Sequence, residues 1–193
     1  MNRPSDGAVV TYGQMAENFQ VLFKQGYLAR REGRVAQSRA IFIDGVRKAA
    51  EEGDEPSLAE ALCGLAQAEN DIGNCEAAQH HYANAAVLYR RIGPPERLAY
   101  AIRHEADLLR QSQHSSEAET LYLEAEAIYR QGGEDSALDL ANTLRGLALV
   151  KEAQGDLNAS RPRWQEAREL YATCNVKVAV AECDKRLSVA GSA

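Results

Sequence analysis

The sequence contains no uninterrupted run of about 18 apolar residues, which is the length that a membrane-spanning helix requires, so it predicts no transmembrane segment. The N-terminal stretch MNRPSDGAVVTYGQ holds a single arginine and a short Ala-Val-Val run. That pattern is too weak for a secretory signal. The two absences together predict a cytoplasmic protein that does not act at a membrane.

Cysteine is scarce, and no two of the four cysteines are spaced as CxxC; they are Cys63, Cys75, Cys174 and Cys183. On the helices expected below, Cys63 and Cys75 would lie more than ~10 Å apart. A disulfide needs Cα atoms within about 7 Å. Cys174 and Cys183 fail in a similar way. We therefore predict four reduced thiols.

The motifs of catalysis and cofactor binding are also missing. No HExxH pattern or glycine-rich nucleotide loop occurs, and the adjacent His80 and His81 would point about 100° apart on a helix. The carboxylates in EAEAIYRQGGEDSALDL are expected on solvated helix faces. The sequence therefore predicts no cofactor, no metal site and no enzymatic activity.

The charge balance is acidic. The formal net charge is −6 and the isoelectric point is about 5.3. Such a chain should repel a phosphate backbone, so we do not expect a nucleic acid partner.

What the sequence does contain is an internal repeat. Four copies align on a small residue, at spacings of 40, 40 and 42, and each copy has a second small residue and then an aromatic one. The first small residues are Gly26, Ala66, Ala106 and Ala148, and the aromatic residues are Phe42, Tyr82, Tyr122 and Trp164. A glycine marks the turn in three copies, Gly33, Gly73 and Gly155, where the third copy has Gln113. Small residues let helices approach closely, and the aromatic side chain fills the space beside them.

Within each copy the apolar residues have helical spacing. Met15, Phe19, Leu22 and Gly26 follow one another at intervals of 4, 3 and 4, and no segment alternates with period two. The breaks EGDEPS, GPP, GGEDS and TCN divide the chain into residues 1–11 (a flexible N-terminal segment), the repeats 12–54, 55–94, 95–134 and 135–174, and a capping helix 175–190.

Three local signals predict where individual helices begin and end. Gly53 should stop a helix, and Ser57 with Glu60 has the spacing of a capping box at the start of the next one. Pro94 and Pro95 suit the first turn of a helix. Pro162 would cost about 3 kcal/mol inside a helix, so we expect that helix to begin late, near Ser160, or to be kinked.

The order small, turn glycine, small, aromatic, small in Ala66, Gly73, Ala78, Tyr82 and Ala85 resembles the tetratricopeptide repeat (TPR) family. The resemblance covers about residues 12–173. The copies are longer than the usual 34 residues and are similar to the variant found in kinesin light chains and many bacterial regulators. It implies an all-α, right-handed α-solenoid of four antiparallel helix pairs plus a C-terminal capping helix. The repeated tyrosines are then packing residues.

The resemblance also implies that the first helix of each pair lines a concave groove that binds a protein or peptide. The expected groove residues are Phe23, Tyr27, Arg30, Cys63, Gln67, Asn70, Arg103, Asp107, Arg110, Asn142, Arg145, Leu149 and Glu152. Because guanidinium groups bind carboxylates with two hydrogen bonds, Arg103, Arg110 and Arg145 favour a segment with an acidic residue and an apolar anchor.

Several alternatives remain open at this point. Asp107 is spaced to neutralise Arg103 and Arg110, Glu105 could be a buried partner for an arginine, and the segment before Tyr12 could cover the groove aromatics. The leading hypothesis is a protein–protein interaction module. The alternatives are a self-associating structural scaffold, such as a homodimer formed through Val9 and Val10, and a sensor domain for a small acidic ligand or signalling peptide.

Overall fold

A computed structural model describes residues 12–189, with side chains described for residues 18–188. The described part is helical and contains no strand, which confirms the all-α prediction. The helices are α1 (Tyr12–Arg31), α2 (Val35–Glu52), α3 (Glu55–Asp71), α4 (Cys75–Ile92), α5 (Pro95–Gln111), α6 (Ser115–Tyr129), α7 (Ala137–Ala153), α8 (Leu157–Thr173) and α9 (Lys177–Val189), with a short 3₁₀ turn at Gly133–Ser136. None of these helices is long and apolar enough to cross a membrane.

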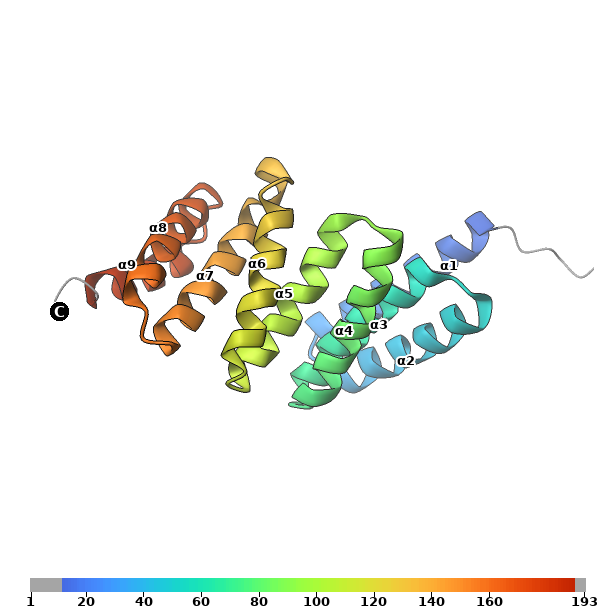
Figure 1. Ribbon diagram of the computed structural model, residues 1–193. Helices are drawn as coiled ribbons and strands as arrows, with labels where there is room; N and C mark the ends of the chain where they lie inside the picture. Colours follow the sequence, from blue (N-terminus) through green and yellow to red (C-terminus); the bar gives the residue numbers. More distant parts are fainter. Residues whose placement is uncertain (1–11, 190–193) are drawn as a thin grey trace, which may run out of the picture.

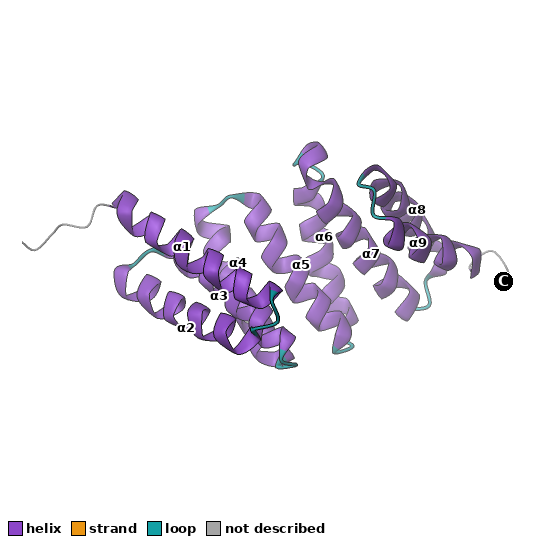
Figure 2. Cartoon of the chain, turned by 180° about the vertical axis from the view of Figure 1, so that it is seen from behind, coloured by secondary structure: helices purple, strands orange, loops and turns teal. Residues whose placement is uncertain are grey.

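The helices are arranged as successive antiparallel pairs in a solenoid. Each helix packs mainly against the one before it and the one after it, and α1 and α9 lie at opposite ends of the array (Figure 1). In that view α4 and α6 lie in front of α3 and α5, and the view from behind shows the same row of pairs (Figure 2). The first helices α1, α3, α5 and α7 therefore form one face, and the second helices α2, α4, α6 and α8 form the other.

The recurring aromatic residue packs between the first helices of two consecutive repeats. Phe42 is fully buried between Gly26 on α1 and Gly64 on α3. An added Cβ atom would lie 2.8 Å from the Phe42 ring at Gly26 and 2.2 Å from it at Gly64, so neither position has room for a side chain. Tyr122 is buried in the same way against Gly146. The recurring small and aromatic residues thus form the core between neighbouring repeats.

The turn between the two helices of each repeat needs a left-handed backbone. Gly33, Gly73 and Gly155 have φ angles of 76°, 81° and 78°, a region that glycine enters without steric cost. The third repeat has Gln113 at this place, with φ of 65°. Its turn therefore has the same geometry as the others but carries a residue that is less suited to it.

The predicted helix boundaries are confirmed at two places and corrected at a third. Gly53 ends α2 with φ of 68°, and Pro95 is the first residue of α5. The capping box at Ser57 is wrong by one turn, because Asp54 caps α3 and accepts hydrogen bonds from the backbone N–H (3.1 Å) and hydroxyl (2.8 Å) of Ser57. A carboxylate that meets the first free N–H groups caps a helix well.

The expected late start of the last repeat's second helix is also wrong. Helix α8 begins at Leu157, with Asp156 accepting a 2.9 Å hydrogen bond from the N–H of Ala159, and Pro162 lies inside the helix. The missing proline N–H costs about 3 kcal/mol. The helix N-cap and the buried Trp164 and Tyr171 side chains offset that cost, since each large apolar side chain contributes about 1.5–3 kcal/mol when buried.

The last helix, α9, covers the end of the array, as the sequence predicts. It packs on α8 with Cys183 fully buried, while Asp184, Lys185 and Arg186 are exposed. The guanidinium carbon of Arg186 lies 5.8 Å from the centre of the Trp164 ring. All four cysteines are free thiols, which agrees with the spacing argument.

Candidate functional site

The candidate site is the face formed by the first helices, where side chains of consecutive repeats are joined by hydrogen bonds. Arg30 on α1 donates to both oxygens of Asp71 on α3, at 2.6 and 2.9 Å, and to Gln67 Oε1 at 2.9 Å. Gln67 Nε2 in turn lies 2.6 Å from the hydroxyl oxygen of Tyr100 on α5. Two predicted groove residues, Arg30 and Gln67, thus belong to one polar chain that also includes Asp71 and Tyr100 and crosses three helices.

Arg103 lies in the middle of this face but is almost fully buried, with 7% of its surface exposed. It pairs with Asp107 at 3.3 Å and with Asp139 on α7 at 3.5 Å, and it donates to His104 Nε2 at 2.9 Å. The predicted neutralisation by Asp107 is therefore present for Arg103. The guanidinium group holds α5 against α7 and does not face a ligand.

Arg110 and Asp107 do not pair directly, although their spacing allows it. The second Asp107 oxygen accepts a 2.6 Å hydrogen bond from the hydroxyl of Tyr122, and Arg110 Nε reaches the same hydroxyl at 3.4 Å. Arg110 forms no ion pair with any residue that the structure describes. It is the only one of the three predicted anion-binding arginines for which that holds.

Arg145 is paired with the capping helix. Its Nε and Nη2 each donate a 2.8 Å hydrogen bond to the carboxylate of Glu182 on α9, and these bonds lower the pKa of Glu182. Nearby, Asn142 accepts a 2.8 Å hydrogen bond from the hydroxyl of Tyr171. The C-terminal half of the face is thus largely satisfied within the molecule.

The N-terminal end of the same face is hollowed. A cavity of about 460 Å³ is lined by Gln20, Phe23, Lys24, Tyr27, Arg30, Arg31 and Glu60. Phe23 is 3% exposed and stacks on Phe42 at 5.9 Å, so it forms the apolar floor. Burial raises the pKa of the Tyr27 hydroxyl, which therefore remains a hydrogen-bond donor.

The charge in this hollow is mostly positive. Lys24 and Arg31 are exposed and form no ion pair with any side chain that the structure describes, whereas Arg30 is held by Asp71. Glu60 is the only carboxylate among the lining residues. The hollow therefore offers two unpaired cations beside an aromatic floor, on a molecule whose net charge is −6.

The groove residues predicted from the sequence and the lining of the hollow overlap only in part. The prediction included Phe23, Tyr27 and Arg30 and did not include Lys24, Arg31 or Glu60. A signal was available, because Lys24 occupies the position of Gly64 and Gly146 in the aligned copies. The predicted coverage of the aromatics by the segment before Tyr12, and the Val9–Val10 contact, lie outside the described residues.

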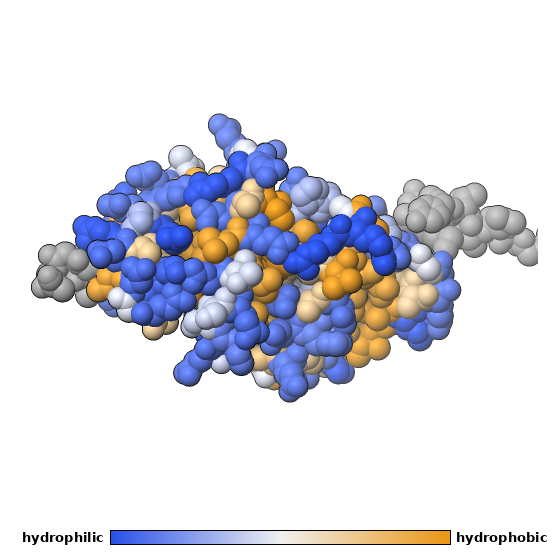
Figure 3. Space-filling view, viewed as in Figure 1, coloured by the Kyte–Doolittle hydropathy of each residue, from blue (hydrophilic) through white to orange (hydrophobic). Residues whose placement is uncertain are grey.

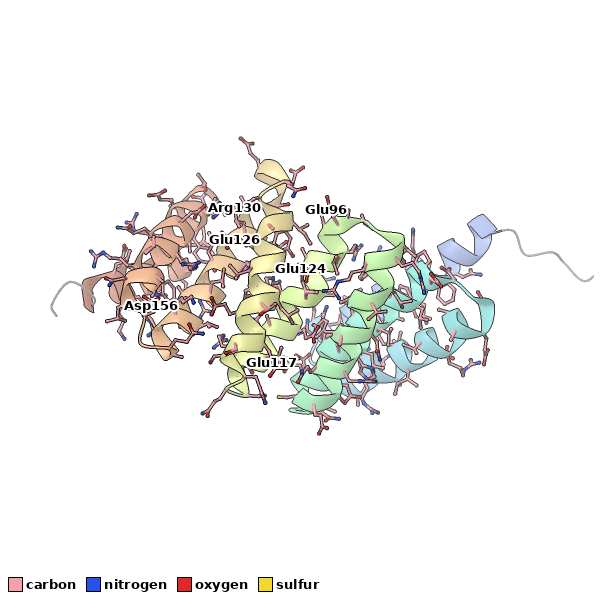
Figure 4. The ribbon with its side chains drawn as sticks, viewed as in Figure 1. Glu96, Glu117, Glu124, Glu126, Arg130 and Asp156 are labelled. Carbon is pink, nitrogen blue, oxygen red and sulfur yellow. The ribbon has the colours of Figure 1, made fainter. Side chains whose placement is uncertain are left out.

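The opposite face has a different character. Its second helices are linked by ion pairs: Arg90 with Glu124 at 2.7 Å, and Arg130 with both Glu126 and Glu166 at 2.6 Å. Figure 4 shows Glu124, Glu126 and Arg130 along α6. In the space-filling view, hydrophilic residues cover most of this side, and hydrophobic residues form patches among them (Figure 3). This face is therefore largely neutralised by its own pairs.

Among the described residues, no group of three or more histidine, cysteine, aspartate or glutamate side chains is placed to hold a metal ion. What the candidate site presents is therefore hydrogen-bond donors, acceptors and cations along a helical face, a set suited to holding a ligand.

No family model and no curated protein matches the sequence. Among solved structures, the chain is similar to BtubC (BKLC) from P. vanneervenii, with a TM-score of 0.73 and 22% identity over 81% of this chain. It is also similar to a putative kinesin light chain of P. anserina with nearly identical TPR-like repeats, with a TM-score of 0.59 and 14% identity.

The chain has a TPR-like repeat fold. The match covers 91% of this chain and 95% of the P. anserina protein, so the two arrays are of comparable extent. The chain spans less than two thirds of BtubC, 64% of that protein. At these identities the likeness concerns the fold.

Proposed function

We propose that the chain is a protein–protein interaction module that binds a segment of a partner protein along the face of α1, α3, α5 and α7. The observation that carries the proposal is the hollow at the N-terminal end of this face, where Lys24 and Arg31 lie beside Tyr27 and form no ion pair with any side chain of residues 18–188. Two cations above an aromatic floor suit a carboxylate next to an apolar side chain. The partner segment is therefore acidic at this point.

The rest of the segment runs along the polar chain of the face. Gln67, Asn70, Arg110 and Asn142 offer side-chain amide and guanidinium groups to a peptide backbone or side chain. The proposed binding surface thus comprises Phe23, Tyr27, Arg30, Gln67, Asn70, Arg103, Arg110, Asn142 and Arg145. We add Lys24, Arg31 and Glu60 because they line the hollow. Arg103 and Arg145 support this surface through their intramolecular pairs.

Selection from a random-peptide display library tests this function. The wild-type chain should enrich peptides that combine a carboxylate with an apolar residue. Changing Lys24 and Arg31 to glutamate should lower the affinity of the chain for the selected peptides by about tenfold or more, because two charge-assisted contacts are replaced by repulsion. Arg161 and Lys185 are exposed cations away from the hollow, and changing both to glutamate gives a control with the same charge change.

If the control variant loses affinity as much as the Lys24 and Arg31 variant, the effect comes from net charge and the assignment of the hollow is wrong. If no peptide is enriched, the partner is not a linear segment. The sensor alternative uses the same hollow for a small acidic ligand, since about 460 Å³ is within the usual range for such sites. Calorimetric titration with a free dicarboxylate distinguishes it from peptide binding.

Self-association is a second candidate function, and exposed apolar side chains on the outer side of α1 favour it. Val21 is 58% exposed and Leu28 is 42% exposed, whereas the equivalent Ala61 and Ala68 of the second repeat are fully buried by the first repeat. Lys24 lies between Val21 and Leu28, and its charge would weaken an apolar contact between two copies of the chain at this surface. A mass measured by light scattering that rises with concentration, and no longer does so when Val21 and Leu28 are changed to serine, would support a homodimer.

A further inference from the structure

One position on the first helices differs between the repeat junctions. The aromatic residue of each repeat packs against this position on the next repeat. The position is Gly64 after Phe42, His104 after Tyr82, and Gly146 after Tyr122. At Gly64 and Gly146 an added Cβ atom would lie 2.2 and 2.4 Å from the aromatic ring, so these two junctions have no space for a side chain. The middle junction instead holds a whole imidazole ring.

The spacing of the first helices follows this difference. Helices α1 and α3 approach each other closely, and so do α5 and α7, whereas α3 and α5 come less close. Glycine permits close approach of two helices, and a ring between them prevents it. His104 therefore acts as a wedge between α3 and α5, at the junction that has repeats one and two on one side and repeats three and four on the other. Across this junction α4 still packs on α5, as α2 packs on α3 and α6 packs on α7.

The contacts of the wedge require an uncharged imidazole. The His104 ring stacks on Tyr82, at 5.2 Å between ring centres and 12° between planes, and meets the edge of Tyr100 at 4.4 Å. Its Nε2 lies 2.9 Å from Nη2 of Arg103. Because a guanidinium group can only donate, Nε2 must accept and cannot carry a proton while this bond exists.

The surrounding charges favour the same state. On α5 itself Arg103 and Asp107 face the ring, with Nδ1 lying 3.8 Å from the Asp107 carboxylate, and Arg30 approaches from α1. Asp139 on α7 pairs with Arg103, and α4 contributes the phenol of Tyr82. Burial first, and then Arg103 and Arg30, lower the pKa of His104 well below its usual value.

We propose that the junction between the second and third repeats is the joint of the solenoid, and that it opens when His104 takes up a proton. The proton on Nε2 breaks the hydrogen bond from Arg103 and places two positive charges against each other. The ring then leaves its stack on Tyr82, and α5 separates from α4. The two halves remain packed, because Phe42 and Tyr122 lie against glycine and contain no group that titrates in this range. The curvature of the binding face would thereby respond to acid.

Hydrogen–deuterium exchange, read by mass spectrometry and compared between variants at one pH, tests the joint. The His104→Phe variant keeps a ring in the stack but cannot take a proton. At pH 7.5 we expect wild type and His104→Phe to exchange alike. At pH 4.5 α4 and α5 of the wild type should exchange faster than those of His104→Phe, while α1, α2, α7 and α8 match. The opening constant should rise up to about tenfold per pH unit below about 6.5.

Two further variants make the test specific. His104→Gly copies the other junctions and should also lose the response to acid, and His80→Gln removes an exposed histidine and should keep it. Circular dichroism shows that each variant is folded. Equal exchange of wild type and His104→Phe at pH 4.5 would overturn the proposal. Acceleration spread evenly over all helices would overturn it as well, because the acid response would then be global unfolding.

Discussion

Arg145 on α7 and Glu182 on α9 are joined by two hydrogen bonds of 2.8 Å. The pair matches that of Arg103 on α5 with Asp139 on α7, because Arg103 and Arg145 occupy the same position of the aligned copies. Arg30 on α1 pairs with Asp71 on α3 from a different position of its copy. Ion pairs of arginine with a carboxylate therefore link α1 with α3, α5 with α7, and α7 with α9. This pairing also explains why Arg103 and Arg145, which suggest an anion site in the sequence, are not free to bind an anion.

The first prediction concerns the strength and pH dependence of this pair. Glu182→Gln should lower the free energy of unfolding by no more than about 1 kcal/mol at pH 7, because both side chains are about a third exposed (35% and 32%) and water screens such pairs. The pairing lowers the pKa of Glu182 in the folded state. Its contribution is thus present above the unfolded value of about 4.3 and is lost as pH falls through the folded value.

Urea unfolding of wild type and Glu182→Gln at pH 7 and at pH 3 measures this contribution. The difference between the two proteins should be present at pH 7 and should shrink as the pH is lowered to 3. A difference of the same size at both values would show that the substitution acts through packing of α9.

The second prediction concerns Glu105, a half-buried carboxylate at a position where the other repeats have Leu65 and Leu147. It forms no ion pair with a described residue, and burial raises its pKa. We expect Glu105→Leu to raise the free energy of unfolding by about 1 kcal/mol at pH 7 through apolar burial. Thermal unfolding against Glu117→Leu, an exposed position on α6 (Figure 4), controls for the general effect of adding leucine.

The pH dependence at Glu105 has the opposite sign to that at Glu182. A raised folded pKa means that the ionised carboxylate costs stability above that pKa and that the cost fades as pH falls. The gap between Glu105→Leu and wild type should therefore shrink between pH 7 and pH 4. A gap that widens on acidification would show that the carboxylate is favourably paired in solution.

The third prediction uses the left-handed turn at Gln113. Replacing this residue with glycine should stabilise the protein by about 1 kcal/mol, the cost of a left-handed conformation for a residue with a Cβ atom. The reverse change, Gly73→Gln, should destabilise it by a similar amount, because nothing lies within 4 Å of a Cβ there and the effect is confined to the backbone. Denaturant midpoints of the two variants should move in opposite directions, and movement in the same direction would contradict the turn assignment.

The fourth prediction concerns the close contact between α7 and Tyr122. Gly146→Ala should cost about 1–3 kcal/mol, because the new Cβ would lie 2.4 Å from the ring and the Tyr122 hydroxyl is held by Asp107. A double-mutant cycle with Tyr122→Leu separates this clash from a loss of flexibility. The two changes should be clearly non-additive, and simple additivity would rule out the clash.

The sequence alone was sufficient for the architecture because that information is local and repeated. The small and aromatic residues at Ala66, Tyr82 and their equivalents impose the same packing in every copy, so one alignment yields the helices and the core. The start of α8 was mispredicted because a cap at Asp156 and the burial of Trp164 outweigh a local proline penalty, and the sequence does not show that balance.

The contacts made by the side chains of the candidate face were predicted less completely than the architecture, for a different reason. Whether an arginine is free depends on the carboxylates that the fold brings to it. Glu182 comes from another helix, and the sequence around Arg145 does not reveal it. The spacing of Asp107 did predict the pair with Arg103, since that pair lies within one helix. Lys24 was not named because only a comparison with Gly64 and Gly146, at the same position of the aligned repeats, singles it out.

The central claim, that α1 and α3 hold a partner segment in the hollow, is tested most directly by chemical-shift mapping. A peptide enriched from the display library is titrated into isotope-labelled protein, and the backbone shifts are followed residue by residue. The account predicts the largest changes at Lys24, Tyr27, Arg31 and Glu60, with smaller ones at Gln67 and Asn70. Changes concentrated on α2, α4, α6 and α8 would contradict it and move the interface to the opposite face.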